Sequence, residues 1–301
     1  MSRTLRQFRR NMVIWYLMFL GTLFGLSAYT AWRMSIDARG AARDLAVLYA
    51  DSFGQFIDNS LQASDWVLAS VSTNAEDALD SSKLDPLYQL SLTRAPFIRS
   101  LSVLDASGTI IASSNQANLG VVVSTQTFFP PASGDATVLR IGEPWQGRDF
   151  FNGHPLSGGA PLDVRQPWLI PMTRTIRLGE QALTLLVAFN PDYFIAQFAQ
   201  RLEAIGANLV WYRLDGVVLL DSGNLARAGS RTDEKVLHSP EEAYARQMWS
   251  PWATAVSMEY PSSVRVDLNA DRVWRGWWSE IRSLLALAGL TALLVFLVLF
   301  N

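Results

Sequence analysis

Two long apolar runs stand near the two ends of the chain. The first extends from Met12 to Trp32 and the second from Ser283 to Phe300, and neither contains a charged side chain. As α-helices that rise about 1.5 Å per residue, both are long enough to cross the roughly 30 Å hydrocarbon core of a bilayer. The pattern therefore predicts two transmembrane helices that flank a large domain.

The charges beside the first run predict its orientation. Four arginines and no acidic residue precede it, and clustered arginines stay on the cytoplasmic side. We therefore expect both termini in the cytoplasm and the intervening residues on the opposite side. Aromatic residues at the ends of the runs would lie at the bilayer interfaces: Trp15, Tyr16, Tyr29, Trp32, Trp274, Trp277 and Trp278. The alternative, a cleaved signal peptide, is less favoured because the apolar stretch is long and Tyr29 to Arg33 is a poor cleavage site.

The residues after the first run continue a helical pattern. Apolar side chains recur at a spacing of three to four from Leu45 to Val71, which keeps them on one face of a helix. The sequence thus predicts that the membrane helix extends into a stalk over residues 33–76. Polar residues interrupt the pattern at 77–86, and a short helix is expected at 87–94.

Two hairpin patterns follow, 108 residues apart. In the first, strand-like runs at Ser100–Asp105 and Thr109–Ser114 flank a turn at Gly108. In the second, similar runs at 208–212 and 217–221 flank a turn at Gly216. Glycine at such a turn supplies a positive φ, so one hairpin alone is weak evidence. Two of them, each followed by further strand-like runs, predict a duplicated domain.

The remaining pattern completes two sheets. Strands are expected at 137–141, 168–176 and 181–189 after the first hairpin, and at 253–259 and 263–268 after the second. A helix at Pro191–Ala204, with proline in its first turn, would connect the sheets. Residues 143–167 are rich in glycine and proline, which predicts an irregular segment that either covers a site or is disordered.

At this point the chain resembles a known family. A membrane span, a stalk helix, two hairpin-led sheets and a second span resemble the double Cache sensor region (tandem PAS-like, PDC-type) of bacterial transmembrane receptors. The resemblance covers roughly residues 34–280. It departs from the family in the long insert between Asn152 and Gln166 and in an abbreviated second sheet, and it lacks the aromatic, arginine and aspartate set of amino-acid-binding members. The segments that carry it are Ile141–Phe150, Trp168–Ile176, Leu185–Phe198 and Val210–Gly223.

The resemblance implies an α+β fold and a domain order. We expect two transmembrane helices that flank a long stalk helix and two PAS-like antiparallel sheets. The expected segments are a cytoplasmic N-terminus (1–11), transmembrane helix 1 (12–32), the stalk (33–76), a membrane-distal PAS-like domain (77–190), a connecting helix (191–206), a membrane-proximal PAS-like domain (207–270), a juxtamembrane helix (271–282) and transmembrane helix 2 (283–300).

The resemblance also implies a location and a role. The chain would lie in the inner membrane of a bacterium, with its sensor domain in the periplasm. It would pass the state of a small-molecule ligand through the second span to a cytoplasmic output module beyond Asn301, of the histidine kinase type or the diguanylate cyclase and phosphodiesterase type. Such receptors belong to two-component or cyclic-di-GMP signalling and act as homodimers.

Composition narrows the chemistry. The net charge is −2 overall, and it is −6 over residues 11–301 (21 basic and 27 acidic residues), which argues against a nucleic-acid partner. The lack of cysteine excludes disulfides and thiolate chemistry. We find no nucleotide-binding, metalloprotease or serine-hydrolase motif and expect no catalytic residue, cofactor or metal in this segment. His154 and His238 have no second histidine nearby. Three aspartates, Asp77, Asp80 and Asp85, could mimic a calcium cage but lack EF-hand spacing, so we interpret them as a solvated turn.

Arg148 and Arg174 are the candidate ligand-binding residues. A guanidinium offers planar donors for a carboxylate or phosphate, and Trp145, Phe150 and Trp168 could supply apolar walls. The sequence thus suggests a small anionic ligand in the membrane-distal domain. The alternative is structural: Arg148 could pair with a nearby carboxylate and pin its loop, the available ones being Asp149, Glu143 and Asp163.

Gly21 and Gly25 form a G-x-x-x-G motif in the first span, which lets two helices approach closely. We interpret it as a candidate dimerisation site, although glycine is frequent in membrane helices. The rival function is a bitopic membrane assembly protein, similar to a polysaccharide co-polymerase, that acts through oligomerisation. A periplasmic enzyme anchored at both ends ranks third, because we find no catalytic residues for it.

Overall fold

The computed structural model describes residues 3–73, 95–132, 138–156, 161–178, 181–232 and 251–300. The expected break at 77–86, the short helix at 87–94, the three aspartates proposed as a solvated turn and His238 lie outside these residues. The chain divides into two units, one formed by Met1–Leu45 with Asn269–Asn301 and the other by Ala46–Leu268. Helix α1 (Arg3–Thr73) contributes to both.

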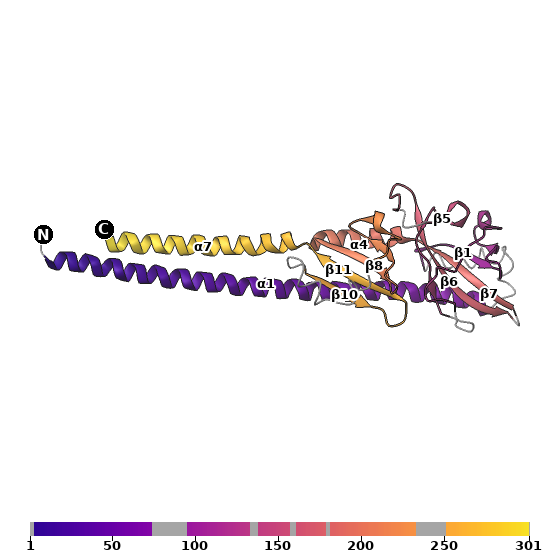
Figure 1. Cartoon of the computed structure of the whole chain (residues 1–301), viewed down its shortest axis with the longest axis horizontal. Helices are drawn as coiled ribbons and strands as arrows, with labels where there is room; N and C mark the ends of the chain where they lie inside the picture. The colour runs from indigo at the N-terminus through magenta and orange to yellow at the C-terminus, as the bar shows by residue number, and fades with distance from the viewer. Residues whose placement is uncertain are drawn as a thin grey trace. The chain divides into compact units, whose positions relative to one another are not determined.

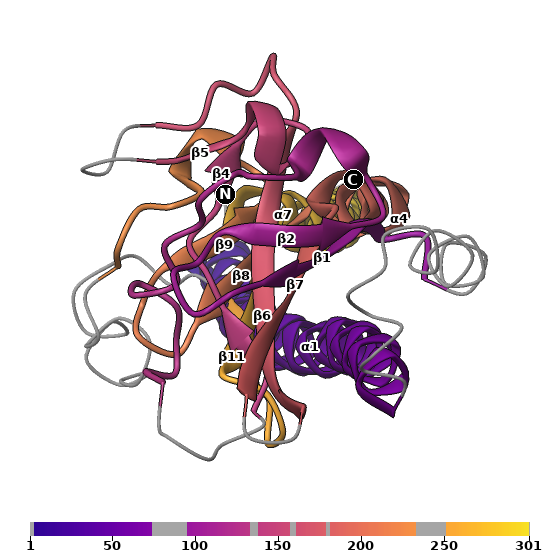
Figure 2. The ribbon, with the colours of Figure 1, turned by 90° about the vertical axis from the view of Figure 1, so that its right-hand side faces the viewer.

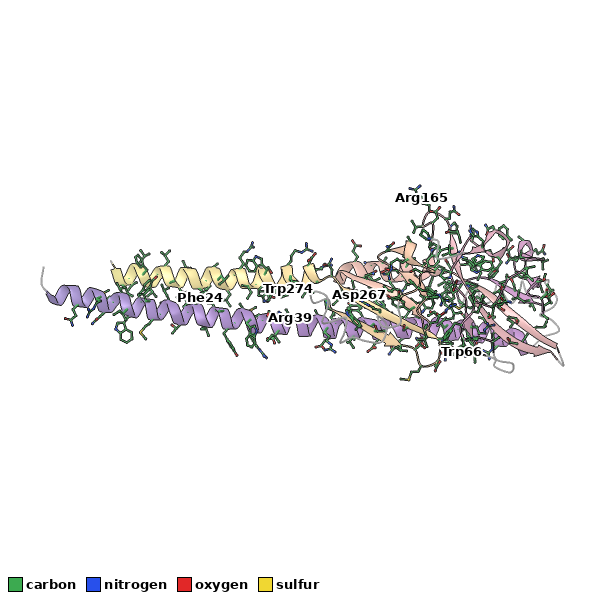
Figure 3. All side chains as sticks on the ribbon, in the orientation of Figure 1. Phe24, Arg39, Trp66, Arg165, Asp267 and Trp274 are labelled. Carbon is green, nitrogen blue, oxygen red and sulfur yellow. The ribbon has the colours of Figure 1, made fainter. Side chains whose placement is uncertain are left out.

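The first unit pairs the N-terminal part of α1 with α7 (Ala270–Phe300). By length and composition, both helices are apolar enough to cross a membrane. The Tyr16 hydroxyl donates a hydrogen bond to the Ala292 carbonyl (3.2 Å). The Arg39 guanidinium lies 5.5 Å from the centre of the Trp274 ring (Figure 3). The predicted juxtamembrane helix and second span form one continuous helix.

The second unit contains two antiparallel sheets (Figure 1). In the described residues, the first sheet has seven strands in the order β2-β1-β7-β6-β4-β5, with β3 paired to β6. Its strands are β1 (Ile98–Leu104), β2 (Ile110–Ser113), β3 (Arg140–Ile141), β4 (Trp145–Gln146), β5 (His154–Pro155), β6 (Trp168–Leu178) and β7 (Gln181–Phe189). The second sheet has the order β10-β11-β8-β9. Its strands are β8 (Ala207–Arg213), β9 (Val218–Asp221), β10 (Trp252–Val256) and β11 (Ser262–Leu268).

Helix α4 (Pro191–Ile205) connects the sheets, as predicted. The Asn190 side chain caps its first turn by accepting a hydrogen bond from the Asp192 amide, and Gly206 ends it with a φ of 65°. These are local signals, so the sequence pattern alone located the helix well.

The two predicted hairpins are confirmed and follow the same plan. β1 and β2 join through a turn in which Gly108 has a φ of 84°, and β8 and β9 through a turn in which Gly216 has a φ of 89°. Each pairing contains one irregularity, and a 3₁₀ helix follows each second strand: η1 (Gln116–Asn118) and η4 (Leu225–Arg227). A Cβ on Gly108 would lie 2.6 Å from the Val123 carbonyl oxygen, so this turn requires glycine.

The segment at 143–167, predicted to be irregular, is partly ordered. It contains β4, the 3₁₀ helix η2 (Phe150–Asn152) and β5, and β4 joins the first sheet by pairing with β6. The frequent glycines and prolines limit each strand to two residues. In the second sheet the strand expected at 253–259 ends at Val256.

An aromatic cluster joins α1, α4 and both sheets. Phe198 of α4 lies 4.6 Å from Phe53 of α1, measured between ring centroids. Phe194 stacks on Phe189 of the first sheet at 4.9 Å and lies 6.0 Å from Trp211 of the second. All five side chains are 1% exposed or less. Figure 2 shows α1 and α4 to the right of strand β6, with β4 and β5 above it and to its left.

We predict that Phe198→Ala strongly destabilises the second unit. Removing a buried ring from a cluster that cannot collapse costs about 3–5 kcal/mol, which corresponds to a fall on the order of 10 °C in the midpoint of thermal unfolding. The measurement is thermal unfolding of the full chain in detergent. The matched control is Phe151→Ala, because that ring is 49% exposed; equal shifts for the two variants would contradict the prediction.

Candidate functional site

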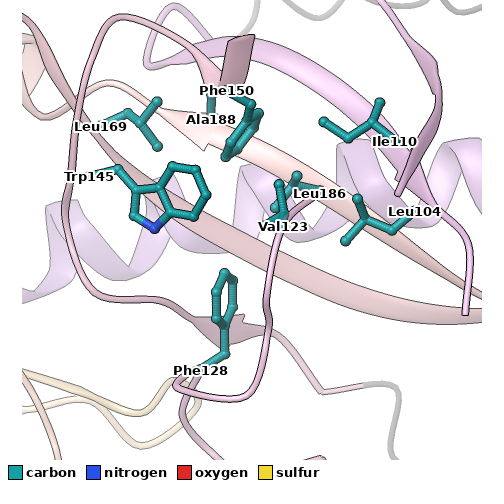
Figure 4. Close-up of a cluster of buried hydrophobic side chains, with 9 residues drawn as sticks. All are labelled: Leu104, Ile110, Val123, Phe128, Trp145, Phe150, Leu169, Leu186 and Ala188. Carbon is teal, nitrogen blue, oxygen red and sulfur yellow. The ribbon is translucent and has the colours of Figure 1, made fainter. Parts of the chain in front are cut away.

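The outer face of the first sheet is the face turned away from α1 and α4. Cross-strand pairing of Ile170 with Phe189 places both on the helix-covered face, since Phe189 contacts Phe194. Alternation then places Leu169, Leu186 and Ala188 on the outer face. These side chains belong to a buried apolar cluster (Figure 4). Its other members are Leu104, Ile110, Val123, Phe128, Trp145 and Phe150.

The loop around β4 covers this face. Trp145 and Phe150 pack edge to face with ring centroids 5.6 Å apart, and they are 5% and 1% exposed. Gly147 makes the cover tight, because its φ is 131° and a Cβ there would lie 2.5 Å from the Gly153 Cα. The Arg99 guanidinium donates to the carbonyls of Arg148 (3.3 Å) and Trp168 (2.6 Å), which fixes the loop to β1.

Asp149 is the polar centre of the cover. Its carboxylate accepts hydrogen bonds from Ser100 Oγ (2.7 Å), Asn118 Nδ2 (2.9 Å) and Asn115 Nδ2 (2.8 Å). It also caps η2, because one of its oxygens accepts from the Phe150 amide. The residue is 5% exposed, so these donors replace the water that the charge would otherwise need.

One hydroxyl on the outer face is unsatisfied. Thr173 follows Leu169 and Pro171 on the same side of β6 and is 1% exposed. Its Oγ1 has no hydrogen-bond partner within the described ranges. The outer face thus combines an apolar floor, an ordered aromatic cover and buried polar groups.

The predicted site residues do not gather in one place. Trp145 and Phe150 lie together in the cover, and Arg148 between them in sequence is exposed. Arg174 lies on the opposite, helix-covered face, where it forms an ion pair with Asp65 of α1. Trp168 is 2% exposed at the start of β6. The structure therefore brings Arg148 near the cover residues but does not bring Arg174 to them.

The carboxylates considered as partners of Arg148 have other contacts. Glu143 lies 3.3 Å from Arg231 and 3.7 Å from Arg213, and Asp149 is held by the cluster described above. Asp163 accepts from the Arg165 amide in its own loop. His154, the other candidate in this segment, is exposed in β5.

Sequence reasoning missed the role of Asp149. A signal was present, because Asp149 and Asn152 have the spacing of a capping box, in which each side chain bonds to the other residue's backbone. Its partners Ser100, Asn115 and Asn118 are distant in sequence, and their convergence depends on the pairing of β1 with β7.

Comparisons with known proteins identify the fold. No protein-family model matches the sequence, and no curated protein is similar to it at a significant level. The extracellular domain of rpHK1S-Z16, a protein assigned as a histidine kinase, superposes with a TM-score of 0.52 at 16% identity, covering 81% of this chain and 98% of that one. The periplasmic sensory domain of the Campylobacter jejuni chemoreceptor Tlp1 gives 0.51 at 11% identity, covering 79% and 98%.

A third match is an extracellular ligand-binding receptor from Desulfohalobium retbaense, with a TM-score of 0.50 and 10% identity over 73% of this chain and 39% of that one. The chain thus has the fold of the extracytoplasmic sensor domains of bacterial receptors. The resemblance predicted from the sequence is confirmed at the level of this sensor-domain fold.

We predict that Asp149→Ala loosens the cover. The substitution removes the acceptor of the buried Ser100 hydroxyl and the half-buried Asn115 amide and the shortest hydrogen bond of Asn118 Nδ2, at about 1–3 kcal/mol for each group left unsatisfied. Limited proteolysis of the full chain should then cut residues 142–156 faster than in the unsubstituted protein. Asp163→Ala, which removes an exposed carboxylate from the same segment, is the control, and equal cleavage of both variants would count against the assignment.

Proposed function

We propose that this chain is the ligand-sensing region of a bacterial transmembrane receptor. The supporting observation is the sensor fold, which covers most of the chain and nearly all of two solved sensor domains. The two hairpin-led sheets correspond to the two modules of a double Cache region, with the first sheet as the membrane-distal module. The sensor region would lie in the periplasm, anchored in the inner membrane by α1 and α7.

The connection from the second sheet to α7 supports a relay through the membrane. Strand β11 ends at Leu268 and α7 begins at Ala270, so only Asn269 separates them. A ligand that prefers one arrangement of the sheets could thus bias α7, by no more than its difference in affinity for the two states. The receiver would be a cytoplasmic kinase or a cyclic-di-GMP output module.

Arg213 is positioned to couple the two sheets. This β8 residue is 1% exposed, and its guanidinium donates to the carbonyls of Thr127 (3.0 Å) and Ile141 (2.9 Å) beside and within the first sheet. It also forms a two-bond pair with Asp215 in the second hairpin, at 2.7 Å for each bond. A shift of the first sheet would therefore be transmitted directly to this hairpin through Arg213.

For the ligand, we propose a small anion that contacts Arg148 at the rim of the cover, above Trp145 and Phe150. Arg148 suits this role because it is exposed and its backbone is held by Arg99. Arg174 would instead tie β6 to the stalk through Asp65.

We further propose a homodimer through α1. Gly21 and Gly25 are exposed, and a Cβ at either position would meet nothing within 4 Å. This surface would leave room for a second helix. An assembly protein similar to a polysaccharide co-polymerase is the rival function, and the paired sheets favour the sensor.

The proposed topology predicts opposite cysteine accessibilities. The chain has no native cysteine, so a single introduced cysteine is labelled without background. Met258→Cys, at a fully exposed side chain in the turn between β10 and β11, should react with a membrane-impermeant maleimide in cells with a permeabilised outer membrane. Gln7→Cys should react only after the inner membrane is opened; labelling of both from the same side would rule out the topology.

The proposed ligand class predicts a response to small carboxylates. We would fuse residues 1–301 to a histidine kinase output module and measure autophosphorylation in membranes with a panel of dicarboxylates and amino acids. At least one compound should change the kinase rate, and Arg148→Ala should raise its half-effective concentration about tenfold, the value of one charge-assisted hydrogen bond.

Arg165→Ala is the matched control, since Arg165 is another exposed arginine of the same segment (Figure 3). An undiminished response in Arg148→Ala would remove Arg148 from the site. A fusion that responds to none of the compounds would refute the carboxylate class.

A further inference from the structure

A cavity of about 180 Å³ lies between α1 and the second sheet. It is distinct from the outer face described above, which belongs to the first sheet. Helix α1 forms one wall and strands β10 and β11, with the turn between them, form the other. The lining residues that matter for its chemistry are Asp51, Asp58, Ser257 and Ser262.

The Ser262 hydroxyl faces this cavity. Val264 pairs with Ala255, and a Cβ on Gly54 of α1 would lie 3.2 Å from the Ala255 Cβ, so this side of the sheet faces α1. Ser262 lies two residues from Val264 and therefore points to the same side. It is 1% exposed and is one of the residues that line the cavity. Its hydroxyl is therefore placed to contact a polar atom of a molecule inside the cavity.

The charged side chains that line the cavity are the carboxylates of Asp51 and Asp58. Burial raises the pKa of Asp58, the Glu259 carboxylate raises it further, and a hydrogen bond from Ser257 opposes both. Burial and the charges of Asp65, Glu259 and Asp58 raise the pKa of the neighbouring Tyr260 to about 12 against the opposing charge of Arg174. Carboxylates thus outnumber basic groups around this wall of the sheet.

The nearby arginines are already engaged. Arg174 pairs with Asp65, and Arg265 pairs with Asp267 at 2.7 Å while lying over the Trp252 ring. Arg265 also points to the opposite side of β11 from Ser262, because successive side chains of a strand alternate between its two faces. Neither guanidinium is therefore available to neutralise Asp58.

We propose that this cavity is a second binding site, which takes a small organic ammonium ion. The ammonium group would bind the Asp58 carboxylate, with Asp51 at the cavity mouth adding attraction. The hydroxyls of Ser257 and Ser262 would contact polar atoms of the same ligand. A metal ion fits less well, because the described residues contain no group of three His, Asp or Glu side chains placed to hold one.

Direct binding tests this proposal independently of signalling. Isothermal titration calorimetry of the full chain in detergent would use 1,4-diaminobutane and 1-aminobutane as probes, with calcium chloride as a comparison at matched ionic strength. We expect saturable binding of at least one amine. Asp58→Asn should weaken it roughly tenfold or more, because it removes the charged acceptor. Glu203→Gln, which removes one exposed charge from α4, should leave it unchanged.

Thermal unfolding separates a binding role from a structural one. Without ligand, Asp58→Asn should unfold at the same or a higher temperature than the unsubstituted chain, because it relieves repulsion with Glu259. The amine should raise the midpoint of the unsubstituted chain and not that of the variant. If the variant does not fold, Ser262→Val, which fills the cavity and keeps both carboxylates, should abolish binding instead.

Three results would overturn the proposal. The first is that neither amine binds saturably. The second is that a folded Asp58→Asn or Ser262→Val variant binds the amine as well as the unsubstituted chain does. The third is that calcium binds and neither amine does.

Discussion

The packing of α1 and α4 against both sheets is the constraint on which the second unit depends. Neither sheet can bury its inner face alone, and both do so against the same phenylalanines. Phe194 contacts rings of both sheets, and Phe198 contacts α1. The helix that carries the first apolar run therefore also supplies part of the sensor core, through Phe53, Ile57 and Leu61. A rotation of α1 would have to repack this core, so discrete arrangements are favoured over gradual ones.

The elements that the sequence predicted well are those with local causes. The hairpins follow from glycine at Gly108 and Gly216, and α4 follows from Asn190, proline at its first turn and Gly206 at its end. The position of Arg174 could not be predicted in this way. Its strand was correctly expected, but alternation fixes only that neighbours point to opposite sides. Which side α1 covers depends on tertiary packing, and that choice places Arg174 against Asp65.

The outer face of the first sheet and the cavity between α1 and the second sheet (the α1 cavity) differ in chemistry. The outer face is lined by aromatic and aliphatic side chains, and its central carboxylate, Asp149, is fully satisfied by protein donors. The α1 cavity is small and polar, and its carboxylate Asp58 has a raised pKa because burial and Glu259 oppose its charge. A carboxylate that accepts hydrogen bonds from several protein donors, such as Asp149, organises the loop around it. A carboxylate without a positively charged partner, such as Asp58, attracts a cation. The two sheets thus share one hairpin plan but present different surfaces.

The buried link at Arg213 also sets how the second unit should respond to acid. Burial alone would raise the pKa of Asp215, but the hydrogen bonds and charge of Arg213 lower it below the ordinary value of 3.8. A carboxylate with a lowered pKa stabilises the folded state above that ordinary value and loses the contribution only as the pH falls through the lowered one. The joint between the two sheets should therefore hold throughout mildly acidic surroundings.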